Sequence, residues 1–170
     1  MIAVFFTHGV SLELWDTRGM FSREVKFYQA LAEQAGDICF FTYGRNDRMC
    51  EHRLGPHIRI FPKRIPCPNI LYGMFLPFLY WNELKKVRII RIHQLAGAVP
   101  ALILHWMTRK PLVVRCGFQW LKFVQQQHGS KLKQWVISII ERLTYRAARF
   151  IIHTTKEDAD FVCNRYRVDE

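Results

Sequence analysis

Residues 88–116, RIIRIHQLAGAVPALILHWMTRKPLVVRC, decide the fold class of this chain. An apolar run over Val87–Ile92 is followed by a helical pattern over residues 98–108 and by a second apolar run over Leu112–Arg115. Pro100 falls in the first turn of the predicted helix, where a missing N–H is tolerated. A strand, a helix and a strand in this order indicate two parallel strands joined by a helical crossover.

The same alternation continues on both sides of this stretch. Further strands are predicted near Ile2–Thr7, Ile38–Thr42, Ile58–Phe61 and Phe150–His153, and further helices over residues 20–35, 131–148 and 156–166. Gly36 stands at the expected C-terminal cap of the first helix, and Thr155 with Asp158 fits a capping box at the start of the last. The sequence therefore predicts an α/β domain with a mainly parallel sheet covered by helices on both faces.

The composition is that of one folded domain. The chain has 170 residues, of which 50% are hydrophobic and 23% charged, which argues against disorder. It contains no run of about 20 apolar residues that would span a membrane, and residues 1–9, MIAVFFTHG, lack the basic leader of a signal peptide. The five cysteines form no CxxC pair, and Cys50 with His52 lacks further zinc ligands, so we expect no metal site. Free thiols favour a reducing cytoplasm.

The net charge of +11 favours an anionic partner, which could be nucleic acid, a phosphorylated substrate or anionic lipid. Nucleic acid is the weakest of these, because the sequence contains no helix-turn-helix signature, no RRM aromatic pair and no zinc finger. Two stretches interrupt the α/β pattern: residues 44–57 are polar and turn-rich, and residues 62–81 combine four prolines with aromatic residues. We expect the first to be a surface excursion and the second to begin as an irregular loop.

Polar side chains follow five of the predicted strands. They are Thr7-His8-Gly9, Thr42-Tyr43-Gly44, His93-Gln94, Arg115-Cys116-Gly117 and His153-Thr154-Thr155. Ligands of doubly wound sheets bind beyond the carboxyl ends of the strands, so these residues predict a binding crevice. Any one of these residues alone is explained as an ordinary turn residue. Their occurrence after five strands predicts a binding crevice, but it does not predict which reaction takes place there.

The connection from the first strand to the first helix is unusually long. Ordinary connections of this kind run about 2–6 residues, whereas Ser11–Gly19 carries Trp15, Arg18 and Gly19 in a longer loop. Gly19 and the free amides after it would suit an anion at the helix N-terminus, although a lone glycine is a far weaker signal than GxGxxG. We expect this loop to lie beside the crevice.

Residues 131–148 form an amphipathic pattern. The apolar residues on one side are Leu132, Trp135, Val136, Ile139, Ile140, Leu143 and Ala147. The basic residues on the other side indicate either a solvated face or a contact with an anionic membrane. The aromatic stretch 70–81, followed by Lys85, Lys86 and Arg88, suits a membrane interface and equally suits buried packing.

Four stretches together carry a family resemblance. They are GVSLELWDTRGMFSREVKFYQALAE, FFTYG, RIIRIHQLAGAVPALILHWMTRKPLVVRCGFQW and IERLTYRAARFIIHTTKEDADFV, in that order. The HQxxG segment at 93–97, the downstream RxG at 115–117 and the WxxxGxxxRE loop at 15–24 are its most specific parts. From about residue 2 to residue 163 the chain resembles the N-terminal half of family 4 glycosyltransferases.

The resemblance implies a single Rossmann-like domain that is one half of a GT-B architecture. In that family the N-terminal domain mainly holds the acceptor, and the C-terminal domain grips the nucleotide-sugar donor. Transfer typically retains the anomeric configuration and needs no metal and no cofactor, because the nucleotide-sugar is a co-substrate. We therefore expect a glycan or a lipid-linked acceptor as the partner.

Residue roles are implied by the same resemblance. His93 would be the catalytic residue at the cleft floor, near the transferred sugar. The acceptor side would hold Trp15, where the long loop forms a cleft lip, together with Gln94 and Arg115. The loop near the donor phosphates would hold Gly9, Arg18 and Gly19. Arg23 and Glu24 would fix the loop and helix and do no chemistry.

The printed sequence ends at NRYRVDE, where the family crosses into its donor domain. We therefore expect residues 1–170 to act only with a separate donor-binding domain or subunit, because transition-state stabilisation needs both faces of the cleft. The alternative is a non-catalytic interaction or membrane-surface protein on the same fold. The expected location is cytoplasmic, with attachment to the inner face of the membrane as an open alternative.

Overall fold

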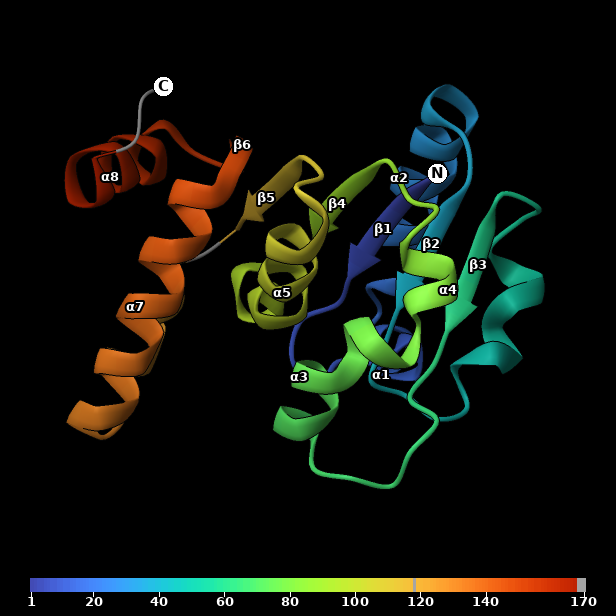
Figure 1. Ribbon diagram of the computed structural model, residues 1–170, viewed down its shortest axis with the longest axis horizontal. Coiled ribbons are helices and arrows are strands. Elements are labelled where there is room, and N and C mark those ends of the chain that lie inside the picture. Colours follow the sequence, from blue (N-terminus) through green and yellow to red (C-terminus); the bar gives the residue numbers. More distant parts are fainter. Residues whose placement is uncertain (118, 168–170) are drawn as a thin grey trace.

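The computed structural model describes residues 1–117 and 119–167 and contains one six-stranded sheet (Figure 1). The strands are β1 (Ile2–Phe5), β2 (Ile38–Phe41), β3 (Ile58–Phe61), β4 (Ile89–Ile92), β5 (Leu112–Cys116) and β6 (Ala148–His153). Their order is β3-β2-β1-β4-β5-β6, and every pair is parallel. This is the strand order of the Rossmann fold, so the predicted α/β class and Rossmann-like topology are confirmed.

Helices occupy the connections between the strands. They are α1 (Leu12–Thr17), α2 (Phe21–Ala35), α3 (Asn69–Leu79), α4 (Trp81–Leu84), α5 (Ala98–Thr108), α6 (Trp120–Gln126), α7 (Lys131–Ala147) and α8 (Lys156–Tyr166), with short 3₁₀ helices η1 (Asp47–Arg53) and η2 (Leu95–Gly97). In Figure 1 the helices α3, α5 and α7 form a row that covers one face of the sheet. The helix α2 covers the other face, where Tyr28 packs edge-on against Phe40.

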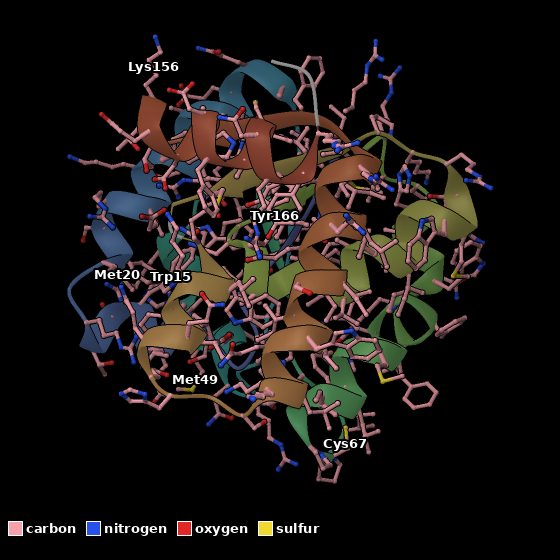
Figure 2. The ribbon with its side chains drawn as sticks, turned by 90° about the vertical axis from the view of Figure 1, so that its left-hand side faces the viewer. Trp15, Met20, Met49, Cys67, Lys156 and Tyr166 are labelled. Carbon is pink, nitrogen blue, oxygen red and sulfur yellow. The ribbon has the colours of Figure 1, made fainter. Side chains whose placement is uncertain are left out.

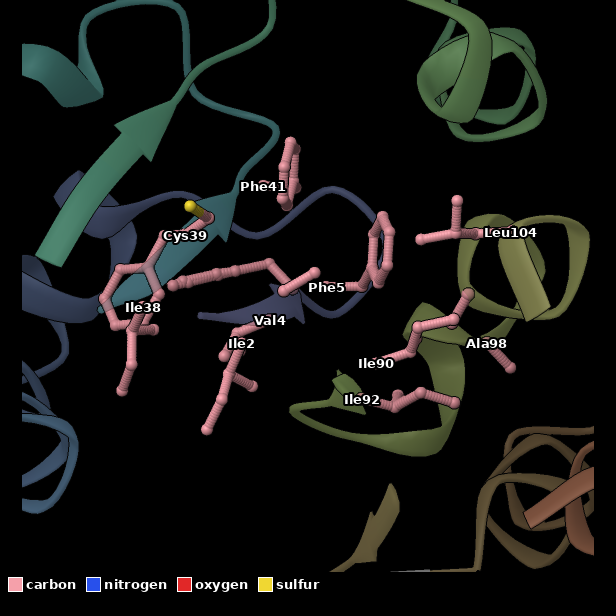
Figure 3. Close-up of a cluster of buried hydrophobic side chains, with 14 of the residues drawn as sticks. Ile2, Val4, Phe5, Ile38, Cys39, Phe41, Ile90, Ile92, Ala98 and Leu104 are labelled. Atoms are coloured by element: carbon pink, nitrogen blue, oxygen red, sulfur yellow. The ribbon is translucent and has the colours of Figure 1, made fainter. Parts of the chain in front are cut away.

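The core lies between the sheet and these two helix layers. The interior strands β1 and β2 are buried at every residue, which explains their continuous apolar sequence. Alternate side chains of β1 point to opposite faces, so Phe5 faces the layer of α5 whereas Val4 and Phe6 face α2. Figure 3 shows Phe5 close to Leu104 of α5, with Ile90 and Ile92 beside them.

The predicted helix ends are confirmed where side chains cap them. The hydroxyl of Thr155 accepts a hydrogen bond from the Asp158 N–H and opens α8 as predicted. Gly36 ends α2 with φ of 83°, a value that glycine adopts without strain. Pro100 lies in the first turn of α5, as expected.

Three predicted loops contain helix. Ser11–Gly19 is not an open loop, because Ser11 caps α1 by accepting a hydrogen bond from the Leu14 N–H at 3.0 Å. The excursion at 44–57 contains η1. Residues 62–68 are irregular as predicted, but α3 begins at Asn69 and includes Pro77 close to its C-terminal end. The helix α6 was not predicted at all.

Candidate functional site

The loops that follow the strands are joined to one another along the carboxyl edge of the sheet. The His8 N–H donates to the Ala96 carbonyl at 3.3 Å, which ties the loop after β1 to the loop after β4. The Gly117 N–H donates to Oε1 of Gln94 at 3.0 Å, which ties the loop after β5 to the same region. The loops after β1, β4 and β5 therefore meet at one edge, as predicted, and the binding crevice there stays a prediction. Gln94 takes part at this edge as a link between loops.

At Gly97, the backbone of the turn after β4 packs closely against the backbone at the end of β1. A Cβ atom on Gly97 would lie 2.4 Å from the carbonyl oxygen of Phe6, so the turn after β4 rests directly on the end of β1. Glycine lets two backbone segments approach this closely. The position of His93 relative to β1 depends on this contact, because His93 and Gly97 belong to the same short connection.

His93 lies at the carboxyl end of β4, on the face of the sheet that α2 covers. Its side chain is buried, and its Nδ1 atom lies 2.9 Å from the Tyr28 hydroxyl. Burial lowers the pKa of the His93 ring to about 4, against the opposing effect of Glu24, so the ring is neutral at pH 7. Burial raises the pKa of Tyr28 to about 12, so its hydroxyl keeps its proton.

Glu24 and Arg115 form the charged part of the same site. The Arg115 guanidinium donates to Oε2 of Glu24 at 3.1 Å, and Arg23 donates to Oε1 at 2.9 Å. Burial acts to raise the pKa of the buried Glu24 carboxyl, but the His93 ring and the two guanidiniums outweigh this and hold that pKa below its usual value. Arg115 is partly exposed, so it reaches both the buried carboxylate and the surface.

Trp15 is in the core, which corrects the expectation of an exposed lip. Only 1% of its surface is accessible, and its ring stacks on Phe6 with centroids 4.4 Å apart. The centroid of its ring is also 4.8 Å from that of His93. Because Trp15 lies on the side of α1 that packs against the core, its indole contacts the His93 ring inside the protein and does not face an acceptor.

Gly19 and Arg18 lie in the tight turn between α1 and α2. Figure 2 labels Trp15 and Met20, which lie on either side of this turn. Gly19 is exposed with φ of 67°, and its N–H donates to the Asp16 carbonyl. Gly9 is also exposed, in the loop after β1, where a Cβ atom would lie 3.2 Å from Nδ2 of Asn69. Gly9 therefore lies next to the start of α3, whereas Arg18 and Gly19 border α2.

Two features of the site are not predicted from the sequence: Tyr28 as the partner of His93, and a basic pocket. The pocket has a volume of 330 Å³ and is lined by Arg45, Arg48, Pro62, Lys63, Arg64 and Pro66. Lys63 donates to Oδ1 of Asn69 at 2.7 Å, which connects the pocket to the Gly9 loop. Among the described residues none of its four cations lies within ion-pair distance of a carboxylate. The signal was present in the sequence, since these cations directly follow β2 and β3.

The described residues contain no group of His, Cys, Asp and Glu that could hold a metal ion. Within the same residues no helix is both long and apolar enough to cross a bilayer.

A family model described as Glycosyltransferase Family 4 matches residues 19–170. No curated protein matches the sequence of this chain. Among solved structures, a protein of unknown function from Vibrio parahaemolyticus RIMD 2210633 is similar, at 9% sequence identity and a TM-score of 0.42, over 92% of this chain and 93% of that chain.

Proposed function

The chain belongs to glycosyltransferase family 4, and on this premise we propose that it is the acceptor side of an enzyme that transfers a sugar from a nucleotide-sugar to a glycan or lipid-linked acceptor. The observation that carries the proposal is the network that the buried His93, Tyr28 and Glu24 form with the partly exposed Arg115 at the carboxyl edge of a Rossmann-type sheet. Ligands of such sheets bind at that edge. A donor-binding domain, in the same polypeptide or another, would supply the opposite wall of the cleft.

His93 is suited to hydrogen bonding and poorly suited to be a general base. A ring with a pKa of about 4 is a weak base at pH 7, where an efficient base has a pKa near the working pH. We propose that the protonated Tyr28 hydroxyl donates to Nδ1, which places the proton of the neutral ring on Nε2. We propose that this N–H donates to an oxygen of the transferred sugar and holds it in position.

Arg115 is suited to bind the acceptor. Its guanidinium uses one N–H to hold Glu24, and its other donors make no further hydrogen bond within the described part of the chain, so they can serve an acceptor on the partly exposed side. The buried carboxylate fixes the guanidinium in place, so little side-chain entropy is lost when an acceptor binds. Glu24 is then a positioning residue, in agreement with the structural role expected for it.

The basic pocket favours an acceptor that carries a phosphate or carboxylate group. Four cations without carboxylate partners among the described residues line it, and an anion would neutralise their mutual repulsion. The charge of Lys63 also acts with burial to lower the pKa of His8, which connects the pocket electrostatically to the loop after β1. The exposed Gly9 and the Arg18–Gly19 turn, in contrast, are proposed to face the donor phosphates.

The test uses the chain together with its donor-binding domain. Radiolabelled nucleotide-sugars are incubated with lipid and glycan extracts, and transfer is followed by the appearance of label in the product. Arg115→Gln should raise the acceptor KM about tenfold, the loss of one charge-assisted hydrogen bond, with little change in donor KM. Arg59→Gln, on the exposed part of β3, is the matched control.

Two results would contradict the proposal. One is an acceptor KM that Arg115→Gln and Arg59→Gln leave equally unchanged. The other is acceptor protection, measured by amide hydrogen exchange, that lies away from residues 7–10, 93–97 and 115–117 at the carboxyl edge.

A further inference from the structure

The helix α7 is amphipathic in an unexpected direction: its apolar stripe faces away from the protein. Leu132 is 70% exposed and Trp135 is 60% exposed. The residues that α7 buries include the polar Glu141, Thr144 and Tyr145. Glu141 accepts hydrogen bonds from the Leu121 N–H and from the Tyr166 hydroxyl, and Tyr145 packs on Tyr166 of α8. The buried side of α7 thus combines these polar residues with Ile137, and the apolar side that contains Leu132 and Trp135 is left exposed.

The exposed apolar surface of this helix layer also includes side chains of α3 and α5, which lie in the same row as α7. We name it the outer apolar face and define it by Ile70, Phe75, Phe78, Trp106, Leu132 and Trp135, each at least 46% exposed. The helix α5 packs between α3 and α7, so the three helices form one layer (Figure 1). Several large apolar side chains exposed on one helix layer are typical of a surface that binds a partner.

The charges around this face identify the partner. Exposed Lys131, Lys133, Arg142 and Arg146 border the apolar stripe of α7, and α3 and α5 contain no acidic residue. The sole carboxylate of α7 is Glu141, which is buried. A surface with apolar residues in the centre, tryptophans among them and cations at the border matches the interface of an anionic bilayer.

A second copy of the chain fits this face poorly. Pairing of two such faces would bring the bordering cations of α7 toward one another, in a chain whose net charge is +11. A bilayer with anionic lipids has a negatively charged surface, which attracts the bordering cations, and an apolar interior, which accommodates the exposed apolar side chains. A membrane-spanning arrangement does not arise from α7, whose 17 residues include four exposed cations.

We propose that the outer apolar face binds the protein to an anionic lipid bilayer, with α7 lying in the plane of the interface. Leu132 and Trp135 enter the acyl boundary, and the bordering lysines and arginines contact lipid phosphates. This proposal does not depend on the sugar-transfer reaction, because it rests on α3, α5 and α7 and not on the His93 network.

The test is sedimentation of the full chain with vesicles of phosphatidylcholine alone or mixed with phosphatidylglycerol. We expect binding to the mixed vesicles, weakened at high salt. The double variant Leu132→Ser/Trp135→Ser should reduce that binding at least about tenfold, because two large apolar side chains no longer enter the bilayer. The control Met49→Ser/Phe150→Ser removes two exposed apolar side chains outside the face and should bind like the wild type.

A second variant tests the proposal even if Leu132→Ser/Trp135→Ser fails to fold. Lys131→Gln/Lys133→Gln/Arg142→Gln changes exposed side chains alone and should lose the preference for phosphatidylglycerol while its circular dichroism stays native. Equal binding by Leu132→Ser/Trp135→Ser and wild type would overturn the proposal, as would equal binding to both vesicle types. Self-association that the same substitutions abolish, without vesicle binding, would assign the face to a second copy.

Discussion

The Nδ1 atom of His93 lies 2.9 Å from the hydroxyl oxygen of Tyr28, and both side chains are buried between β4 and α2. This bond joins the strand end that carries the candidate site to the helix that begins after the Gly19 turn. It also explains how a histidine is accommodated in an apolar interior, since the ring stays neutral and its buried nitrogen has a partner.

Removal of the Tyr28 hydroxyl should therefore cost stability. We expect Tyr28→Phe to lower the free energy of unfolding by about 1–2 kcal/mol, because Nδ1 of His93 is left buried without a donor. Urea denaturation measures the change. Tyr43→Phe is the control, since the Tyr43 hydroxyl makes no hydrogen bond within the described residues. Equal losses for the two variants would show that the His93 bond contributes nothing specific.

The neutral His93 ring should also make stability depend on pH. The pKa of this ring is about 4 in the folded protein and 6.5 in its ordinary state, so below pH 6.5 the unfolded chain binds a proton that the folded chain does not. The stabilising effect is therefore present above pH 6.5 and is lost as the pH falls toward 4.

The loss specific to His93 should reach about 2 kcal/mol between pH 7 and pH 4.5. Urea denaturation across this range, compared with His93→Asn, isolates it from the titration of the carboxylates. The exposed His52 is the control position, and His52→Asn should follow the wild-type profile. Parallel profiles for His93→Asn and wild type would contradict the low pKa of His93.

The ion pair between Arg115 and Glu24 should contribute more than a surface pair. Arg115→Met leaves a buried carboxylate with Arg23 alone as its partner, and we expect a loss of about 1–3 kcal/mol. Arg59→Met breaks the exposed pair with Asp37 and should cost at most about 1 kcal/mol. Thermal unfolding compares the two variants. The double variant Glu24→Gln/Arg115→Met should cost less than the sum of its single changes.

The sheet was predictable because each strand has a local signal. Residues 88–116 contain two apolar runs and a helical pattern that no other arrangement accommodates as simply, and the structure places β4, α5 and β5 there. The carboxyl-edge position of His93 and Arg115 follows from the same pattern. The side-chain partners of His93 and Arg115 were not predictable, because they are distant in the sequence. Tyr28 is 65 positions from His93, and Glu24 is 91 positions from Arg115.

The direction of an amphipathic helix is also not a local property. In α7 the apolar stripe with Leu132 and Trp135 would ordinarily face the core, but the neighbours of α7 offer partners for its polar side. Trp15 shows the reverse error, since an aromatic residue in a polar stretch was expected at the surface and is buried. In both cases tertiary contacts decide which side of a short segment is covered.

The approach of the β4 turn to the end of β1 gives the last prediction. Gly97→Ala should lower the free energy of unfolding by about 3 kcal/mol, because the added Cβ would lie 2.4 Å from the Phe6 carbonyl oxygen and the backbone cannot rotate away as a side chain would. Gly19→Ala is the matched comparison. A Cβ there meets no atom within 4 Å, so only its φ of 67° opposes alanine, at a cost of about 1 kcal/mol. Urea denaturation of both variants tests the ranking. Amide exchange should also accelerate at His8 in Gly97→Ala, since its N–H bonds to the Ala96 carbonyl. A smaller loss in Gly97→Ala than in Gly19→Ala would show that the turn carrying His93 does not depend on this close contact.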